Sequence, residues 1–492
     1  MKKLILKGFA LLTLAAGVSS CGNDFLETDY YSGLDIETSL NSVSNLTTAL
    51  NGTYYRLYHY QFAGNYAIAI GDVPTDLSYW NNQTNHWNDI YQFTFTDTST
   101  YLLAIWNMGY KTADNAARII RAAEALYADA DEETKAELDA IVAEAYALRG
   151  YAQLMLVNIY GHQIKVAGTD FSEQPGIVVI DRPIKALTQV ERSTVGKSYE
   201  AVIGDLKASL ARFAAAGGDR GDLFYFGQAA VQGLLARTYL YMEQWDKAKE
   251  HARKALDIAG ITTLTYTAEG YKALYNTNNS NVESIFALAI TPSQNWSANS
   301  FGTLWTSYNM SPSPKLQALY AATDCRKSIM GMAKESTAAV PVYGGGKLAH
   351  FASANPANAT NYIVNAPEMF LIIAEAEAQS PNGSLAAAQN ALLTVAKRNS
   401  AIAAAADLPS DKAGLLSFIK DERARELFQE GHRLYDLRRW GDNASVYAYS
   451  APEIKFSYND YKISDLVFPI PVDEINSGFG VKQNDWSGTL PR

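Results

Sequence analysis

The stretch of sequence that decides the fold runs from Asp421 to Asp442 and reads DERARELFQEGHRLYDLRRWGD. Apolar side chains recur along one side of a helix that we expect to begin near Asp411. Carboxylates four residues apart lie beside that apolar side, at Glu422, Glu426 and Glu430. Gly431 then allows the chain to turn out of the helix, because glycine adopts left-handed backbone angles without strain.

A second, shorter helix is predicted to follow this glycine and to end at Trp440 and Gly441. Its apolar side chains should pack inward, while its arginines are placed to meet the carboxylates of the first helix; these arginines are Arg433, Arg438 and Arg439. The pattern indicates a corner of a large helical protein that is held together by ion pairs.

The same segment resembles the R-x-x-E-L-x-x-E-G-x-R-x-x-D-L-x-R-W-G signature of the SusD/RagB family, the outer-membrane nutrient-binding lipoproteins of the Bacteroidetes. The matching residues are Arg423, Glu426, Leu427, Glu430, Gly431, Arg433, Asp436, Leu437, Arg439, Trp440 and Gly441. With gaps at the loops, the resemblance extends from Cys21 to Trp486.

The N-terminus has the pattern of a secretory signal. Lys2 and Lys3 precede a short apolar run, and two small residues precede Cys21, so residues 1–20 are predicted to be a lipoprotein signal peptide. Cys21 would become the acylated first residue, with palmitate-type chains holding the protein in the membrane. We expect residues 21–36 to form a lipid-anchored tether and residues 37–492 to form a single domain.

Composition narrows the class of protein. The chain has 492 residues, of which 48% are hydrophobic, and a net charge of −10 with no Lys/Arg-rich run, which disfavours nucleic-acid binding. Once Cys21 is acylated, only Cys325 is left, so no intrachain disulfide is expected. The six histidines are scattered and show no metal-ligand spacing, so we predict no metal site and no cofactor.

Helical hairpins recur along the chain. Two long helices are predicted between Tyr101 and Tyr160, a tetratricopeptide-like pair lies within 195–259, and a looser pair lies within 367–398. Such pairs cannot bury their apolar faces alone and must stack on one another. We therefore predict an all-α fold, a tetratricopeptide-like superhelix of helical hairpins with long ligand-binding loops and minor β elements.

Three long interruptions, residues 71–98, 291–314 and 341–366, lack helical period and are rich in polar and aromatic residues. Sugar rings need flat aromatic surfaces bordered by hydrogen-bonding groups, and the first two segments have that composition. The resemblance also implies ligand-binding loops in these regions. The candidate ligand-binding residues are Tyr79, Trp80, Asn81 and Trp87 in the first segment and Asn295, Trp296, Trp305 and Tyr308 in the second.

No catalytic constellation is found. Glu422, Glu426 and Glu430 share one helix face with several arginines, which favours structural ion pairs over the facing carboxylates of a glycosidase. The resemblance implies a non-catalytic glycan-binding lipoprotein on the outer face of the outer membrane, which delivers its ligand to a SusC-like TonB-dependent transporter. The alternatives are the same fold capturing peptides, a tetratricopeptide scaffold that binds a protein, and a glycoside hydrolase.

Overall fold

The computed structural model describes residues 39–80, 84–276, 281–308, 310–330, 333–334, 342–343, 345–351, 353, 355–450 and 453–490. Helices make up 55% of it and strands 6%, which confirms the predicted helical fold with minor β elements. The predicted signal peptide, Cys21 and the tether precede the described residues and stay predictions.

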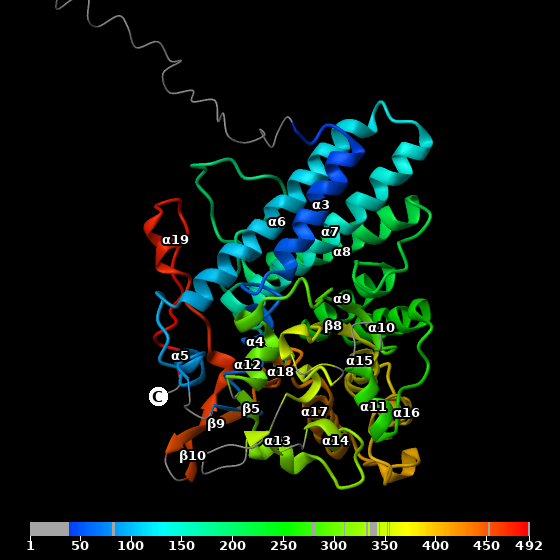
Figure 1. Cartoon of the computed structure of the whole chain (residues 1–492), viewed down its shortest axis with the longest axis vertical. Helices are drawn as coiled ribbons and strands as arrows, with labels where there is room; N and C mark the ends of the chain where they lie inside the picture. Colours follow the sequence, from blue (N-terminus) through cyan, green and yellow to red (C-terminus); the bar gives the residue numbers. More distant parts are fainter. Residues whose placement is uncertain are drawn as a thin grey trace, which may run out of the picture.

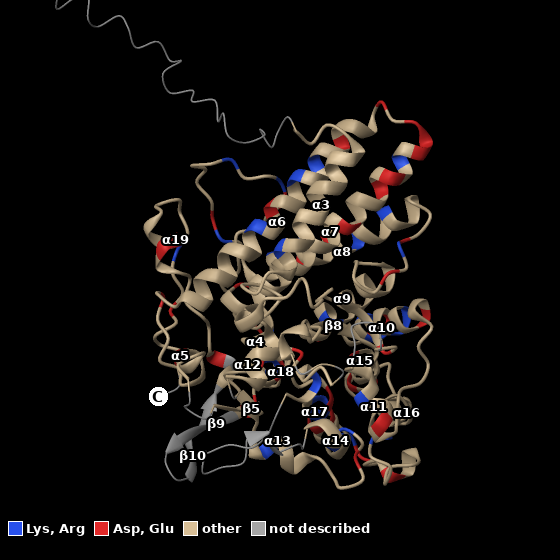
Figure 2. Ribbon diagram, viewed as in Figure 1, with Lys and Arg blue, Asp and Glu red and all other residues tan. Residues whose placement is uncertain are grey.

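A first group of long helices packs side by side in the upper half of the view in Figure 1. These helices are α3 (Val43–Tyr58), α6 (Thr100–Tyr127), α7 (Glu132–Tyr160) and α8 (Val195–Ala215). Asp131 caps the start of α7, since its side chain accepts a hydrogen bond from the backbone N–H of Thr134 at 2.9 Å. The two helices predicted between Tyr101 and Tyr160 are therefore confirmed, and acidic residues mark the start of the second one (Figure 2).

A second group contains the tetratricopeptide-like pairs. These helices are α9 (Gln228–Tyr241), α10 (Trp245–Ala259), α15 (Ala366–Gln379), α16 (Leu385–Ala396) and α17 (Lys412–Leu427). α10 packs on both α9 and α15, and α15 packs on α16 and α17. Ala248, Ala252 and Ala255 are fully buried, and their small size allows the neighbouring helices to approach.

The other described elements are short. The helices are α4 (Tyr66–Ala69), α5 (Asn88–Tyr91), α11 (Ala268–Leu274), α12 (Phe301–Thr306), α13 (Pro314–Leu319), α14 (Lys327–Met330), α18 (Arg433–Trp440) and α19 (Val472–Asn476), with 3₁₀ turns at Ser297–Asn299, Gly346–Leu348, Pro356–Asn358, Ala405–Asp407 and Ile463–Asp465.

The strands form antiparallel pairs: β1 (Ser78–Trp80) with β5 (Met310–Pro312), β2 (Lys165–Val166) with β3 (Thr169–Asp170), β4 (Ser284–Ala287) with β8 (Tyr362–Asn365), β6 (Ala333–Lys334) with β7 (Val342–Tyr343), and β9 (Asn443–Ser450) with β10 (Glu453–Lys462).

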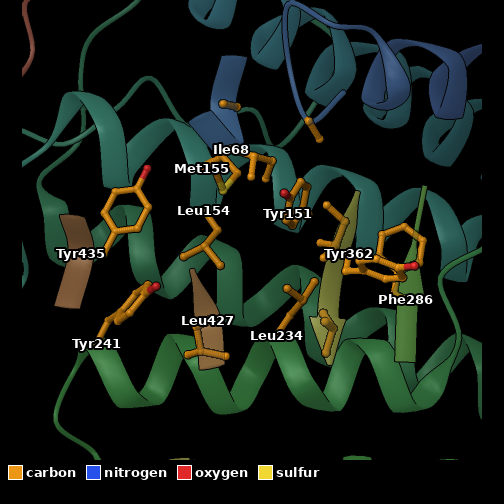
Figure 3. Close-up of a cluster of buried hydrophobic side chains, with 14 of the residues drawn as sticks. Ile68, Tyr151, Leu154, Met155, Leu234, Tyr241, Phe286, Tyr362, Leu427 and Tyr435 are labelled. Carbon is orange, nitrogen blue, oxygen red and sulfur yellow. The ribbon is translucent and has the colours of Figure 1, made fainter. Parts of the chain in front are cut away.

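The hydrophobic core lies where these groups meet. Figure 3 shows Leu154 of α7 pointing toward Leu234 of α9 and Leu427 of α17, while Met155 of α7 lies beside Ile68. Each of these side chains is at most 6% exposed. Full burial of such a side chain contributes about 1.5–3 kcal/mol to the free energy of unfolding. Because these residues come from the beginning, middle and end of the chain, their burial holds distant segments together.

The segment from Asp421 to Asp442 packs against residues from the first part of the chain. α17 begins after Asp411, which caps it, and Gly431 has the left-handed φ of +76° that a turn after the helix requires. Gly431 donates its N–H to Asp72 at 2.8 Å, and Leu434 donates to the carbonyl of Gly71 at 2.8 Å. The predicted corner is therefore real, and it is docked on residues 71–72.

The ion pairs of this corner differ from the predicted ones. Glu422 and Glu426 both bind Arg326, at 2.8 and 2.9 Å, and Glu430 binds Lys347 at 2.6 Å. The arginines of α18 find other partners: Arg433 binds Asp76, Arg439 binds Glu375 and Asp436, and Arg438 donates to the carbonyls of Asn158 and Gly161. The predicted pairing between the glutamates of the first helix and the arginines of α18 is wrong, because those groups face other parts of the protein. The two helices are joined instead by Arg423 of α17, which binds Asp436 of α18 at 2.7 Å.

Within the described residues, no helix is both long and apolar enough to cross a bilayer. Basic and acidic side chains are interspersed along the helices, and no single helix carries most of the Lys and Arg (Figure 2).

Candidate functional site

A cleft of about 750 Å³ opens beside the C-terminal half of α3. Its described lining is unusually rich in aromatic rings. The lining residues are Asn51, Tyr54, Tyr55, Tyr58, Asp222, Phe224, Tyr225, Leu288, Ala289, Ser293, Gln294, Asn295 and Trp296.

One wall of the cleft is a stripe of α3. Asn51, Tyr54, Tyr55 and Tyr58 follow the three- and four-residue spacing that places side chains on one helix face. The opposite stripe, which includes Leu50, is fully buried in the core. Tyr55 keeps 56% of its surface exposed, so the packing of α3 leaves tyrosine rings available at the cleft.

Trp296 forms the facing wall and is half-buried. The centroid of its ring lies 5.1 Å from that of Tyr58 and 5.7 Å from that of Tyr55, at interplanar angles of 37° and 57°. His59 and Tyr60 contact the same indole, at 4.5 and 5.5 Å. The rings are therefore tilted relative to one another, and they form a bent aromatic surface.

Hydrogen bonds hold this wall against α3. The indole Nε1 of Trp296 donates to the backbone carbonyl of Tyr58 at 2.9 Å, and the Tyr58 hydroxyl donates to the carbonyl of Gln294. Burial, with the neighbouring Tyr55, raises the pKa of Tyr58 to about 12, so its hydroxyl keeps its proton at neutral pH. The Asn295 side chain donates to Asn358 at 3.0 Å and fixes the loop from the other side.

The third wall depends on a buried carboxylate. Glu144 of α7 accepts from the hydroxyl of Tyr54 at 2.7 Å and from Nε of Arg220 at 2.6 Å. The Arg220 guanidinium lies over the ring of Tyr225 at 4.1 Å, and Tyr225 meets Tyr54 edge to face at 5.0 Å. One buried acid thus positions two rings of the cleft.

Two predicted site residues line the cleft, Asn295 and Trp296. Tyr79, Trp80 and Trp305 do not, because each is at most 3% exposed. Strand β1 pairs with β5, and this pairing buries Tyr79 and Trp80, while Trp305 packs on Phe428 at 4.9 Å. Rings without an exposed face offer no surface to a ligand in this structure, so the prediction for these three is corrected.

The remaining predicted residues lie elsewhere. Trp87 is 2% exposed and stacks on Tyr101 at 4.3 Å, so it too belongs to the core. Tyr308 is half-buried and stacks on His86 at 3.9 Å, outside the cleft lining. Asn81 lies outside the described residues.

Sequence reasoning missed the tyrosines of α3 and Tyr225. At helical spacing, Tyr54, Tyr55 and Tyr58 match core positions as well as site positions, and only the tertiary structure distinguishes the two. The available signal was the run TyrTyrArgLeuTyrHisTyr over residues 54–60, which holds more rings than one buried helix stripe can accommodate.

The described lining of the cleft does not contain a facing pair of carboxyl groups. Glycosidases place two carboxyl groups across the scissile bond, and Asp222 is the one carboxylate among the described lining residues. The acids of α17 are buried in ion pairs as predicted. Burial by itself raises the pKa of Glu422, but Arg326 and Arg425 outweigh burial and lower it, so this acid stays ionised.

Within the described part of the chain, neither an accessible thiol nor a cluster of metal ligands is found. Cys325 is a buried free thiol, and burial raises its pKa to about 12, so it is not activated as a nucleophile. No group of three or more His, Cys, Asp or Glu side chains that could hold a metal ion occurs among the described residues.

Fold and cleft together define the class: a helical-repeat protein with an aromatic binding cleft. Two family models match the sequence, one described as "Starch-binding associating with outer membrane" over residues 24–240 and one described as "SusD family" over residues 366–486. The chain belongs to the SusD/RagB family, as the signature at Asp421 to Asp442 indicates. No curated protein matches the sequence.

Solved structures share the fold over nearly the whole chain. A SusD superfamily protein from Bacteroides vulgatus is 23% identical with a TM-score of 0.77, covering 92% of this chain and 100% of its own. One from Bacteroides thetaiotaomicron is 21% identical with a TM-score of 0.75, covering 90% and 99%. A SusD-like carbohydrate binding protein from Bacteroides vulgatus is 21% identical with a TM-score of 0.67, covering 85% and 89%. These descriptions associate the family with carbohydrate binding and the outer membrane.

Proposed function

We propose that this protein is a non-catalytic, cell-surface lipoprotein that binds oligosaccharide or polysaccharide in the cleft between α3 and Trp296. The observation that carries the proposal is the cleft itself, in which the exposed ring of Tyr55 and the half-buried rings of Tyr58 and Trp296 lie beside amide and hydroxyl groups. Aromatic rings stack on the C–H faces of sugars, and the polar groups can bind the hydroxyl rim.

The experiment is affinity gel electrophoresis of the soluble form beginning at residue 22, in gels that contain different polysaccharides. Trp296→Ala should weaken retention by about thirtyfold or more, because it removes a central ring worth about 2 kcal/mol at a hot spot. Circular dichroism and thermal unfolding show whether the variant stays folded.

Tyr308→Ala is the matched control, since it removes another half-buried ring from the same part of the sequence but outside the cleft lining. Retention by this variant should stay near that of the parent protein. The opposite result, full retention by Trp296→Ala and loss in Tyr308→Ala, would refute the assignment of the cleft.

We also propose that acylated Cys21 anchors the protein in the outer membrane, facing the exterior, and that its partner is a SusC-like TonB-dependent transporter that receives the glycan. Family membership and the signal pattern of residues 1–20 support this. Radiolabelled palmitate should be incorporated into the parent protein and not into Cys21→Ser, and the transporter should co-purify with the anchored form.

A further inference from the structure

The described lining of the cleft carries a negative charge and no positive charge. Among the described lining residues, Asp222 is charged and there is no Lys, Arg or His. Asp222 is exposed, and one of its carboxylate oxygens accepts the backbone N–H of Phe224 at 2.9 Å. The other lining groups that can bind hydroxyls are uncharged, as in Asn51, Ser293 and Gln294.

The cations nearest in sequence to the lining residues are either paired with an acid or placed on another side of their helix. Arg220 binds the buried Glu144 and covers the ring of Tyr225, so its charge is already paired. Arg56 follows Tyr55 on α3 and is therefore rotated by about 100° around the helix axis from it. Asp219, on the same loop as Asp222, accepts hydrogen bonds from the N–H groups of Gly221 and Gln228 and adds a second negative charge.

This arrangement treats neutral and acidic sugars differently. A sugar hydroxyl can donate a charge-assisted hydrogen bond to Asp222, whereas the carboxylate of a uronic acid has no proton to donate and meets a like charge. Among the described lining residues no cation compensates that repulsion, and the net charge of −10 opposes the approach of a polyanion at longer range.

We propose that the cleft selects uncharged glycans and rejects glycans that carry uronic acids, and that Asp222 is the residue that sets this selectivity. The inference rests on the proposed glycan-binding function and names the chemical class of its ligand. It predicts that acidic glycans are excluded by charge and not by size, because a hexose and its uronic acid differ only at C6.

The test uses matched polysaccharides. Affinity electrophoresis is run in gels containing amylopectin, β-1,3-glucan or galactomannan, each beside the same polymer after oxidation of its C6 hydroxyls to carboxylates. For any polymer that retains the protein, oxidation should weaken retention by about tenfold or more. The loss should shrink at high salt, since salt screens repulsion between solvent-exposed charges. Isothermal titration calorimetry with the retained polymer measures that dependence.

Asp222→Asn should recover several-fold of the retention lost on oxidation. The asparagine oxygen can keep the bond from the Phe224 N–H, so the loop has no reason to move. Asp257→Asn is the control, because it removes one exposed carboxylate from α10, outside the cleft lining. It should leave the preference for the neutral polymer unchanged.

Equal or stronger retention by the oxidised polymers would overturn the inference while the proposed function stands. Selectivity that persists in Asp222→Asn, or that Asp257→Asn removes equally, would overturn the role of Asp222. No retention by any neutral polymer would count against the proposed function itself, and the inference would fall with it.

Discussion

At the scale of the residue, burial decides which aromatic side chain serves the cleft. Trp296 and Trp305 belong to the same segment and have the same side chain, but Trp305 is 1% exposed and packs on Phe428. Trp296 keeps part of its ring at the cleft because its Nε1 is bound to the backbone of Tyr58. Composition around the two residues could not distinguish them, since both lie among Ser, Thr, Gly and Asn.

A buried carboxyl beneath the corner gives a pH-dependent prediction. Burial raises the pKa of Asp72 to about 7, with Glu430 adding to the shift, whereas the unfolded value is about 4. The folded state therefore binds the proton more tightly, and the free energy of unfolding should fall as the pH rises from about 4 to about 7. Asp72→Asn cannot ionise, and its oxygen can still accept the N–H of Gly431.

We expect Asp72→Asn to be more stable than the parent protein at pH 8, by about 1–4 kcal/mol, and to lose that advantage near pH 4. Urea unfolding across this pH range measures the difference. An advantage that does not change with pH would show that Asp72 is ionised in both states or in neither.

At the scale of the element, α17 connects through buried ion pairs to distant segments. Arg326 is fully buried and binds Asp324, Glu422 and Glu426. Arg398, at the end of the α15–α16 hairpin, binds Glu426 and Glu283. The spacing of these glutamates predicted that they form ion pairs, but their partners lie too far along the chain for helical spacing to identify.

Arg326→Met should destabilise the protein by about 3–5 kcal/mol, because it leaves three buried carboxylates without their common cation. Lys254→Met is the control, since Lys254 and Glu250 form an exposed pair on α10 worth less than about 1 kcal/mol. Chemical denaturation of both variants at neutral pH measures the two losses. Similar losses in both would mean that burial adds nothing to the Arg326 network.

At the scale of the whole molecule, side chains far apart in the sequence bind one another. Arg237 of α9 binds Glu368 of α15 at 2.7 Å, and Trp106 of α6 donates to Glu474 of α19 at 3.1 Å. Gly71 lies so close to Gly431 that a Cβ on Gly71 would stand 2.1 Å from the Gly431 carbonyl oxygen.

Gly71→Ala should therefore lower the unfolding temperature markedly, because the corner must move away from residue 71 and strain every contact across this interface. Gly52→Ala in α3 is the matched control, since a Cβ there meets nothing within 4 Å, and it should stabilise the helix by up to about 1 kcal/mol. Differential scanning calorimetry compares the two. Equal unfolding temperatures for Gly71→Ala and the parent protein would contradict the close docking.

The helices were predictable because their signals are local. Asp411 caps the helix that was expected to begin near it, Asp131 caps α7 in the same way, and the alanines of α10 mark a tetratricopeptide-like pair. The site was predictable only in part. The segment that contains Trp296 was identified, but the tyrosines of α3 were not, because helical spacing describes a buried stripe and a binding stripe equally well.

The sequence by itself determined the family and the helical class. Both the signature from Asp421 to Asp442 and the helical spacing of apolar residues are patterns of residues close together in the chain. Only the tertiary structure decided which rings face solvent. The pairing of β1 with β5 buried Tyr79 and Trp80, while the bond from Trp296 to Tyr58 brought a loop against α3 and opened the cleft. Exposure depends on which distant segments meet, and that information is not contained in any one stretch of the chain.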